Sequence, residues 1–218
     1  MAKPGQLFLF GGRLRNALWF KYHGLKPKQR DFDMILLGER EALVSNLLAQ
    51  GYAFGKKNSD VAVVLRKAKV KNPGADINNW LVLDIKIRSI APDILAALAG
   101  IANFTVNGLA LDITDLKSGD WFNKIRGLPG AQDDILHKRL RLVSRWGINI
   151  YACARLVFIG FQPPPAAAVK LMLEDYSKLE PERRAQEIDK TIEYIGDPEL
   201  VREVCARIGI DCEILDQD

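Results

Sequence analysis

The segment Asp31-Phe32-Asp33, followed directly by the apolar run Met34-Ile35-Leu36-Leu37, most restricts how this chain can fold. Side chains on a β-strand alternate between its faces, so the two carboxylates share one face and Phe32 points to the other, into a core. Two aspartates on one face repel each other unless a cation lies between them. The segment therefore predicts a strand start that holds Mg²⁺ or Mn²⁺ against phosphate oxygens. A solvated strand end or a turn is the alternative.

A second pattern lies upstream, where the apolar run Leu7-Phe8-Leu9-Phe10 ends in Gly11 and Gly12. Apolar residues then recur at helical spacing from Leu14, which predicts a strand, a glycine turn and a helix start. Such a turn lets backbone N–H groups approach an anion, and the helix dipole favours that anion. Arg13 and Arg15 lie in the first turn, where cations oppose the dipole but suit a phosphate ligand. An ordinary strand–helix turn is the alternative.

The order of these blocks resembles a known family. Gly11-Gly12-Arg13-Leu14-Arg15-Asn16 followed by Asp31-Phe32-Asp33 resembles the G-G-x-V-R-D … D-x-D signature of the tRNA nucleotidyltransferase and poly(A) polymerase head domain. That domain belongs to the DNA polymerase β-like nucleotidyltransferase superfamily. Two later blocks match in the same order: the stretch 103–110 resembles D-F-T-I-N-A-L-A, and the stretch 127–143 resembles G-x-x-D-L…L-R-x-V. The resemblance covers about residues 7–145.

The chain departs from the family pattern at several positions. Asn16 and Asn103 stand where the family has Asp, and Ile101-Ala102 replace two arginines. The segment 148–152 lacks the charged residues of the family's E-D-x-x-R neck motif, and Arg155 keeps one family arginine one turn later. We therefore expect weak or altered nucleotide selectivity, since base discrimination requires hydrogen-bonding groups placed on the base edge.

The resemblance implies a set of site residues. A third carboxylate in this superfamily comes from a neighbouring strand, and Asp84 is its candidate because Asp84, Lys86 and Arg88 alternate with apolar residues. An Asp that pairs with a surface Lys is the alternative. The implied catalytic and metal-binding residues are Asp31, Asp33 and Asp84, with Mg²⁺ or Mn²⁺ as the cofactor. The implied nucleotide-binding residues are Gly11, Gly12, Arg13, Arg15, Asn107, Asn149 and Arg155.

The net charge of +4 is divided unevenly along the chain. Residues 1–145 carry 23 Lys and Arg against 13 Asp and Glu, whereas residues 146–218 carry 8 against 14. The basic part is therefore the part with the nucleotide-type motifs, which favours a polyanionic ligand such as a triphosphate or RNA. Solvated lysines that cover a sheet are the alternative.

The periodicities predict an α+β protein, in which a nucleotidyltransferase-like mixed sheet with flanking helices precedes a small helical region. The expected domains are a head over 1–145 and a helical neck or appendage over 146–218. Strands are expected at 7–10, 33–37, 61–66, 81–87 and 105–111. Helices are expected at 13–22, 39–50, 148–161, 166–178, 181–195 and 198–208.

The apolar runs and the cysteines of the chain indicate the cellular compartment in which it is expected. No apolar run reaches the ~18 residues that a membrane span requires, and Met1 to Gly5 are not followed by the apolar region of a signal peptide. Cys153, Cys205 and Cys212 lie at no metal-binding spacing, which favours reduced thiols, with a Cys205–Cys212 disulfide as the alternative. We expect a cytoplasmic protein without a membrane partner, and the sequence carries no signal for an oligomeric state.

Two functions of different class fit these features. The first is a Mg²⁺-dependent nucleotidyltransferase that moves an NMP from an NTP to an acceptor hydroxyl by in-line attack on the α-phosphorus. An RNA 3′ end is the acceptor that the resemblance implies, and a protein side chain or a small molecule is the alternative. The second is a catalytically decayed head domain that acts as a binding module, a hypothesis motivated by Asn16 and Asn103. Convergence of the three aspartates in the fold would favour the first.

Overall fold

The computed structural model describes residues 5–28, 32–59, 62–68, 80–144 and 150–210. The strands are β1 (Gln6–Phe10), β2 (Phe32–Leu37), β3 (Ala53–Ser59), β4 (Ala62–Ala68), β5 (Trp80–Ile87), β6 (Leu109–Asp112) and β7 (Arg126–Gly127). The α-helices are α1 (Gly12–His23), α2 (Arg40–Ala49), α3 (Ile94–Ile101), α4 (Ala131–Leu136), α5 (Ile150–Ile159), α6 (Ala166–Ser177), α7 (Pro181–Ile195) and α8 (Pro198–Ile208). Three short 3₁₀ turns accompany them within these ranges: η2 (Thr105–Asn107), η3 (Ile113–Lys117) and η4 (Trp121–Lys124).

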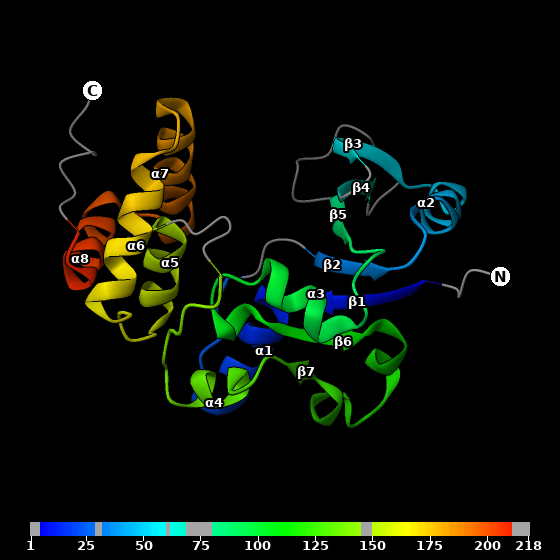
Figure 1. Ribbon diagram of the computed structural model, residues 1–218, viewed down its shortest axis with the longest axis horizontal. Coiled ribbons are helices and arrows are strands. Elements are labelled where there is room, and N and C mark those ends of the chain that lie inside the picture. The colour runs from blue at the N-terminus through cyan, green and yellow to red at the C-terminus, as the bar shows by residue number, and fades with distance from the viewer. Residues whose placement is uncertain (1–4, 29–31, 60–61, 69–79, 145–149, 211–218) are drawn as a thin grey trace.

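The described strands form one seven-stranded mixed sheet in the order β3-β4-β5-β2-β1-β6-β7 (Figure 1). The central pair β2 and β5 is parallel, and the other described pairs are antiparallel. A parallel neighbour needs a long connection. Here α2, β3 and β4 lie between β2 and β5 in the chain. The expected α+β class, a mixed sheet with flanking helices, is confirmed.

Each face of the sheet packs against its own helices. On one face Leu83, Ile85 and Ile87 of β5 are buried with Val44 of α2. On the other face, Ile35 packs with residues of α3. The alternation expected for β5 is therefore confirmed, because Asp84 and Lys86 lie opposite these buried residues and are only half-buried.

The expected strand over 105–111 is wrong in its first half. Thr105–Asn107 forms the 3₁₀ turn η2, and the strand β6 begins at Leu109. A Cβ on Gly108 would come within 2.5 Å of the Leu128 side chain, so a larger residue at this turn would require Leu128 to move. Two further elements were not expected from the sequence. The glycine and lysines of β3 weaken a strand pattern, and α3 lacks the polar residues that would mark a helical period.

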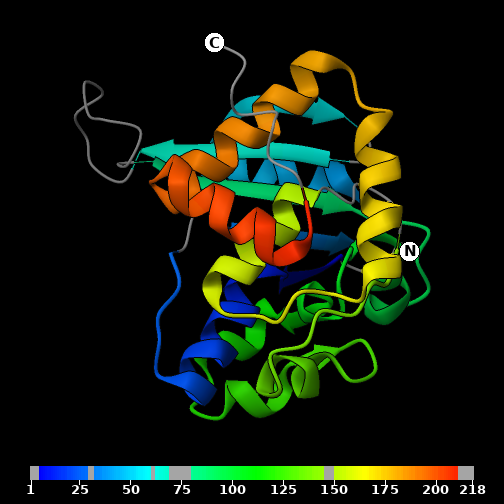
Figure 2. The ribbon, with the colours of Figure 1, turned by 90° about the vertical axis from the view of Figure 1, so that its left-hand side faces the viewer.

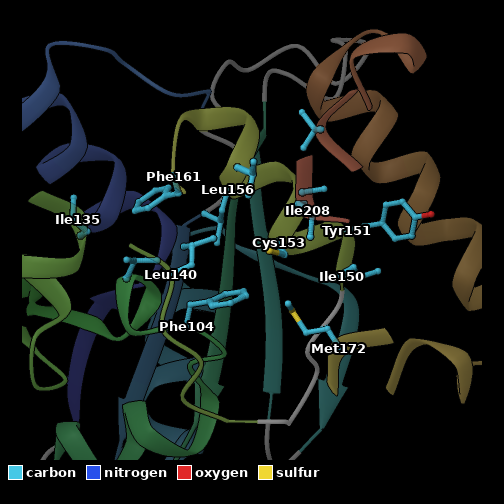
Figure 3. Close-up of a cluster of buried hydrophobic side chains, with 14 of the residues drawn as sticks. Phe104, Ile135, Leu140, Ile150, Tyr151, Cys153, Leu156, Phe161, Met172 and Ile208 are labelled. Carbon is cyan, nitrogen blue, oxygen red and sulfur yellow. The ribbon is translucent and has the colours of Figure 1, made fainter. Parts of the chain in front are cut away.

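The four helices α5–α8 gather beside the sheet and follow the expected spans closely (Figures 1 and 2). They share one hydrophobic core with the first part of the chain, in which Phe104 and Leu140 lie near Cys153 and Leu156 of α5 (Figure 3). The ring centroids of Trp19 in α1 and Phe161 are 4.4 Å apart. The two rings are tilted by 42° to each other, and aromatic pairs at this distance stabilise the core beyond the area that they bury. The two-domain division at residues 145 and 146 stays a prediction.

Two of the cysteines lie in the described part of the chain. Cys153 and Cys205 are both buried, and burial raises the pKa of the Cys153 thiol to about 12. Cys212, and with it the alternative disulfide, lies outside the described residues. In the described ranges, no helix combines the length and apolar character needed to cross a bilayer.

A buried carboxylate fixes the turn that follows α3. Asp134 of α4 is fully buried and accepts a hydrogen bond from Thr105 Oγ1 over 2.5 Å. Its other contacts are charged, with Arg139 Nε at 3.1 Å and Arg141 Nε at 2.6 Å. The backbone of Arg141 also accepts from Thr105 N, over 2.9 Å. The last block of the sequence resemblance, over residues 127–143, therefore holds η2 in place and forms a structural clamp on it.

Removal of this carboxylate tests the clamp. Asp134→Ala leaves two arginines and a buried hydroxyl without their acceptor, so we expect the free energy of unfolding to fall by about 3 kcal/mol or more. The matched control is Asp133→Ala, whose half-exposed carboxylate pairs with His137 and Arg139. That control should cost under ~1 kcal/mol, as exposed ion pairs do. Equal losses for the two variants in urea unfolding would contradict the clamp.

Candidate functional site

The parallel pairing of β2 with β5 brings two of the predicted carboxylates together. Asp33 is the register partner of Asp84, with Phe32 opposite Leu83 and Met34 opposite Ile85. Register partners on parallel strands point to the same face, with their backbones about 5 Å apart. Asp31, the other half of the predicted pair, lies outside the described residues. The structure thus places Asp33 and Asp84 side by side on one face of the sheet.

Asp84 has a cationic neighbour on its own strand. Lys86 Nζ lies 2.7 Å from Asp84 Oδ1, and the two side chains are 26% and 22% exposed. Residues two apart on a strand share a face, so the positive charge of Lys86 lies on the same face as the negative charges of Asp33 and Asp84 and partly neutralises them. The alternative stated for Asp84, an ion pair with a lysine, is therefore present. Asp84 is at the same time the register partner of Asp33.

The donor chemistry of this face fits a hard divalent cation. Carboxylate oxygens are the protein ligands that Mg²⁺ takes, commonly one or two with phosphates and waters. In the part of the chain that the structure describes, no cluster of three or more His, Cys, Asp or Glu is poised to hold a metal ion. Asp33 and Asp84 are two carboxylates on one face, and their oxygens are of the type that Mg²⁺ takes as ligands.

The glycine turn leads from β1 into α1. Gly11 has φ +70°, a conformation that L side chains rarely adopt, and its N–H donates to Leu109 O over 3.1 Å. Gly12 begins α1, whose first turn contains no acidic residue. The first N–H groups of a helix have no partner within the helix. Gly11 thus supplies the turn, and Gly12 keeps the approach to these N–H groups open.

Arg15 anchors a chain of hydrogen bonds across the head. Its Nη1 donates to Asn107 Oδ1 over 2.7 Å, and Asn107 Nδ2 donates to Asn103 Oδ1 over 2.8 Å. Asn103 Oδ1 also accepts from Phe104 N, over 2.9 Å. Asn103 uses only its oxygen in these contacts, as the aspartate of the family pattern could. The structure therefore brings two predicted nucleotide ligands, Arg15 and Asn107, into direct contact.

The charge on Arg15 is poorly solvated. Burial lowers the pKa of Arg15 to about 10, because desolvation disfavours the charged form; Tyr194 and Asp33 act to raise it, and Arg155 to lower it. At neutral pH the guanidinium remains charged. A cation desolvated in this way beside a second arginine gains from an anionic ligand.

Asn16, the other departure from the family pattern, uses both ends of its amide. Its Oδ1 accepts from Arg15 Nε and Nη2 over 3.0 and 2.8 Å. Its Nδ2 donates to Lys28 O over 3.3 Å, which an aspartate cannot do. The amide thus ties α1 to the segment that leads into β2.

The remaining predicted ligands are less closely grouped. The Arg13 guanidinium carbon lies 3.4 Å from the centroid of the Phe32 ring, in a cation–π contact. Arg155 Nη1 donates to Thr191 Oγ1 of α7 over 2.9 Å and acts electrostatically on Arg15. Asn149 lies outside the described residues. α5 therefore contributes Arg155 to the surroundings of Arg15.

The sequence anticipated the lysine at this site only as an alternative, and it did not reveal Tyr194. Lys86 shares a strand face with Asp84 at a spacing of two, and the alternative in which a lysine pairs with Asp84 is the contact that the structure shows. Tyr194 carries no local signal, because it reaches Arg15 only through the packing of α7.

Comparisons with known proteins place this fold. No protein-family model matches the sequence, and no curated protein does either. A Thermotoga maritima CCA-adding enzyme complexed with tRNA is similar in structure, with a TM-score of 0.62 and 16% identity over 94% of this chain and 47% of that chain. A CCA-adding enzyme with CTP gives 0.62 and 18% over 94% and 48%, and a tRNA-processing enzyme in an apo form gives 0.64 and 16% over 98% and 54%.

These similarities show the fold. The chain has the architecture of the nucleotidyltransferase head domain, which confirms the resemblance seen in the sequence blocks at the level of the fold. It spans about half the length of the solved chains that it matches.

Lys86 should compete with a metal ion for Asp84. Lys86→Met removes a cation 2.7 Å from the carboxylate, so we expect Mn²⁺ affinity, measured without nucleotide, to rise by up to about fivefold, the equivalent of ~1 kcal/mol. In an Asp84→Asn background the same change should have no effect on Mn²⁺ affinity. An equal gain in both backgrounds would show that Asp84 is no metal ligand.

Gly12 can be tested apart from folding. A Cβ there would lie 3.5 Å from the flexible Arg15 guanidinium, an ordinary contact, so Gly12→Val should fold. It should weaken NTP binding about tenfold, because it moves a charged phosphate off backbone N–H groups. Gly100→Val is the matched control, since a Cβ at Gly100 in α3 meets nothing within 4 Å. If folded Gly12→Val binds NTP with normal affinity, the glycine loop is an ordinary strand–helix turn and does not bind phosphate.

Proposed function

We propose that this protein is a metal-dependent nucleotidyltransferase that moves an NMP from an NTP to an acceptor hydroxyl, with an RNA 3′ end as the acceptor. The observation that carries the proposal is the register of Asp33 with Asp84 on a sheet face that also lies within electrostatic range of Arg15. The nucleotidyltransferase fold supports it independently.

In this proposal Asp33 and Asp84, with Asp31, hold Mg²⁺ or Mn²⁺. The metal, when bound, neutralises phosphate charge and orients the phosphates. Asp84 lies beside Asp33 and accepts the proton of the attacking hydroxyl at a carboxylate oxygen. The hydroxyl oxygen then bonds to the α-phosphorus, the bridging P–O bond to the β-phosphate breaks, and pyrophosphate leaves.

The triphosphate lies at the start of α1 in this proposal. Gly11 and Gly12 let the phosphates approach the helix N-terminus, and Arg13 and Arg15 add positive charge there. Asn107 keeps Arg15 in place through the 2.7 Å hydrogen bond and contacts the sugar or nucleotide. A bound triphosphate supplies the anion that compensates the desolvated guanidinium of Arg15.

The helical region supplies the base-binding side of the proposed site. Arg155 of α5 already acts on Arg15 electrostatically, and Asn149 precedes α5 in the chain. A head over 1–145 would then hold the triphosphate and metal, and the region 146–218 would face the base. Asn149 can pair with a base edge through its amide.

RNA is the acceptor class that two observations favour. The motif-bearing part of the chain is strongly basic, with 23 Lys and Arg against 13 Asp and Glu over residues 1–145. Among the structures of similar fold, one CCA-adding enzyme is complexed with tRNA and others with CTP or ATP. A protein side chain or a small molecule is the second candidate acceptor, since its hydroxyl could attack the α-phosphorus in the same way.

The hydrogen bonds at the two departures favour an enzyme over a decayed head domain. Asn103 keeps the acceptor contacts that an aspartate would make, and the Asn16 amide adds a hydrogen bond to Lys28 O. Both substitutions therefore leave the ligand-holding residues Arg15 and Asn107 connected.

A labelling reaction tests this function. The protein is incubated with each α-labelled NTP, Mg²⁺ and total RNA, and transfer of label to RNA is expected. Asp84→Asn should reduce the rate by about a hundredfold or more, since a positioned general base contributes 10²–10⁴-fold. The control Asp120→Asn changes an exposed carboxylate and should keep the wild-type rate. If label appears only on protein or on small molecules, the acceptor is not RNA. If no acceptor of any kind is labelled, the proposal is wrong.

Competition among all four NTPs tests base selectivity. We expect incorporation of more than one type of base without a fixed order, because the segment 148–152 lacks the acidic and basic pair that reads a base edge. Incorporation of CTP and then ATP, with UTP and GTP excluded, would contradict this expectation.

A further inference from the structure

A cavity separate from the aspartates opens where α1, α5 and α7 meet. It has a volume of about 270 Å³, and its wall includes Trp19 of α1, Phe158 of α5 and Tyr194 of α7. The segment 25–28, which follows α1, forms another wall of the cavity and contributes Lys26 and Lys28. The volume lies just below the range of drug-sized ligand pockets and suits one planar group.

Trp19 forms the inner wall of this cavity. It is only 1% exposed, and its indole Nε1 is covered by surrounding protein atoms. Trp19 therefore contributes an apolar ring edge to the cavity and no accessible hydrogen-bond donor.

The cavity also combines aromatic rings with positive charge. The rings of Phe158 and Tyr194 meet edge to face, with centroids 6.5 Å apart, and Phe158 is 39% exposed. The charges among its described lining residues are Lys26 and Lys28, and the Lys28 ammonium donates a long hydrogen bond to the backbone oxygen of Glu193, over 3.5 Å. Exposed aromatics beside lysines are the features that bind single-stranded nucleic acid, since bases stack and phosphates pair.

The wall of the cavity is joined to the proposed active site. Lys28 O accepts a hydrogen bond from Tyr194 Oη over 3.5 Å and from Asn16 Nδ2 over 3.3 Å. Asn16 in turn accepts from Arg15. A ligand in the cavity would therefore lie next to the Arg15 network rather than on a remote surface.

We propose that this cavity binds one nucleotide of the single-stranded acceptor RNA. Its base stacks on the exposed Phe158 ring with its edge near Trp19, and its phosphate pairs with Lys26 and Lys28. This inference rests on the proposed function, because an RNA acceptor is part of that proposal.

Binding of a short 5′-labelled oligoadenylate, followed by fluorescence anisotropy without NTP or metal, tests the cavity. Phe158→Ala should weaken binding about tenfold, the usual effect of removing one stacking ring. Lys26→Met/Lys28→Met should lower the dependence of log affinity on log salt by about 0.7 for each phosphate that the lysines no longer neutralise. Leu173→Ala and Lys170→Met change exposed side chains of α6 and should leave binding unchanged.

A second measurement avoids any dependence on variants. In wild-type protein, the oligoadenylate should shift the indole N–H resonance of Trp19, and AMP alone should shift it much less. An unchanged affinity in Phe158→Ala, or a Trp19 resonance that moves with AMP but not with the oligonucleotide, would overturn the inference. Because no chemistry is involved, oligonucleotide binding that persists without transfer would refute only the proposed function.

Discussion

The parallel pairing of β2 with β5 is the constraint on which the candidate site depends. The described neighbouring pairs in this sheet are otherwise antiparallel, and the parallel pair sets Asp33 opposite Asp84. A shift by one residue would turn one carboxylate to the opposite, apolar face. Burial of Leu83 and Ile85 on that opposite face opposes such a shift. Packing of the core thus holds two like charges side by side, at a cost that a cation can offset.

A second set of contacts connects this sheet face to the rest of the protein. Arg15 is bonded to Asn107, whose turn is held by the buried Asp134 through Thr105. On its other side Arg15 bonds Asn16, which reaches the segment before β2. Hydrogen bonds to a buried charge are among the stronger ones in proteins. The guanidinium is therefore fixed in place before any ligand binds.

Much of this arrangement follows from local patterns in the sequence. The alternation around Asp33 and Asp84 predicted both strands and which of their residues share a face, and the apolar spacing predicted α1 and the C-terminal helices. The turn at Thr105 was missed because Asp134 and Arg141, whose hydrogen bonds hold it, are distant in sequence. The same holds for Tyr194, which reaches Arg15 only after α7 packs against α5. Contacts across the core have no local signature, so a period of two or 3.6 residues cannot reveal them.

The central claim is that Asp33 and Asp84 act on one shared cation. A double-mutant cycle with Asp33→Asn and Asp84→Asn, read as Mn²⁺ affinity by electron paramagnetic resonance with a non-hydrolysable NTP analogue, tests it directly. If both carboxylates hold the same ion, each single variant should lose most of the affinity, and the double variant should lose little more than either. Losses that simply add, or a wild type that binds Mn²⁺ no better than the double variant, would contradict the shared site.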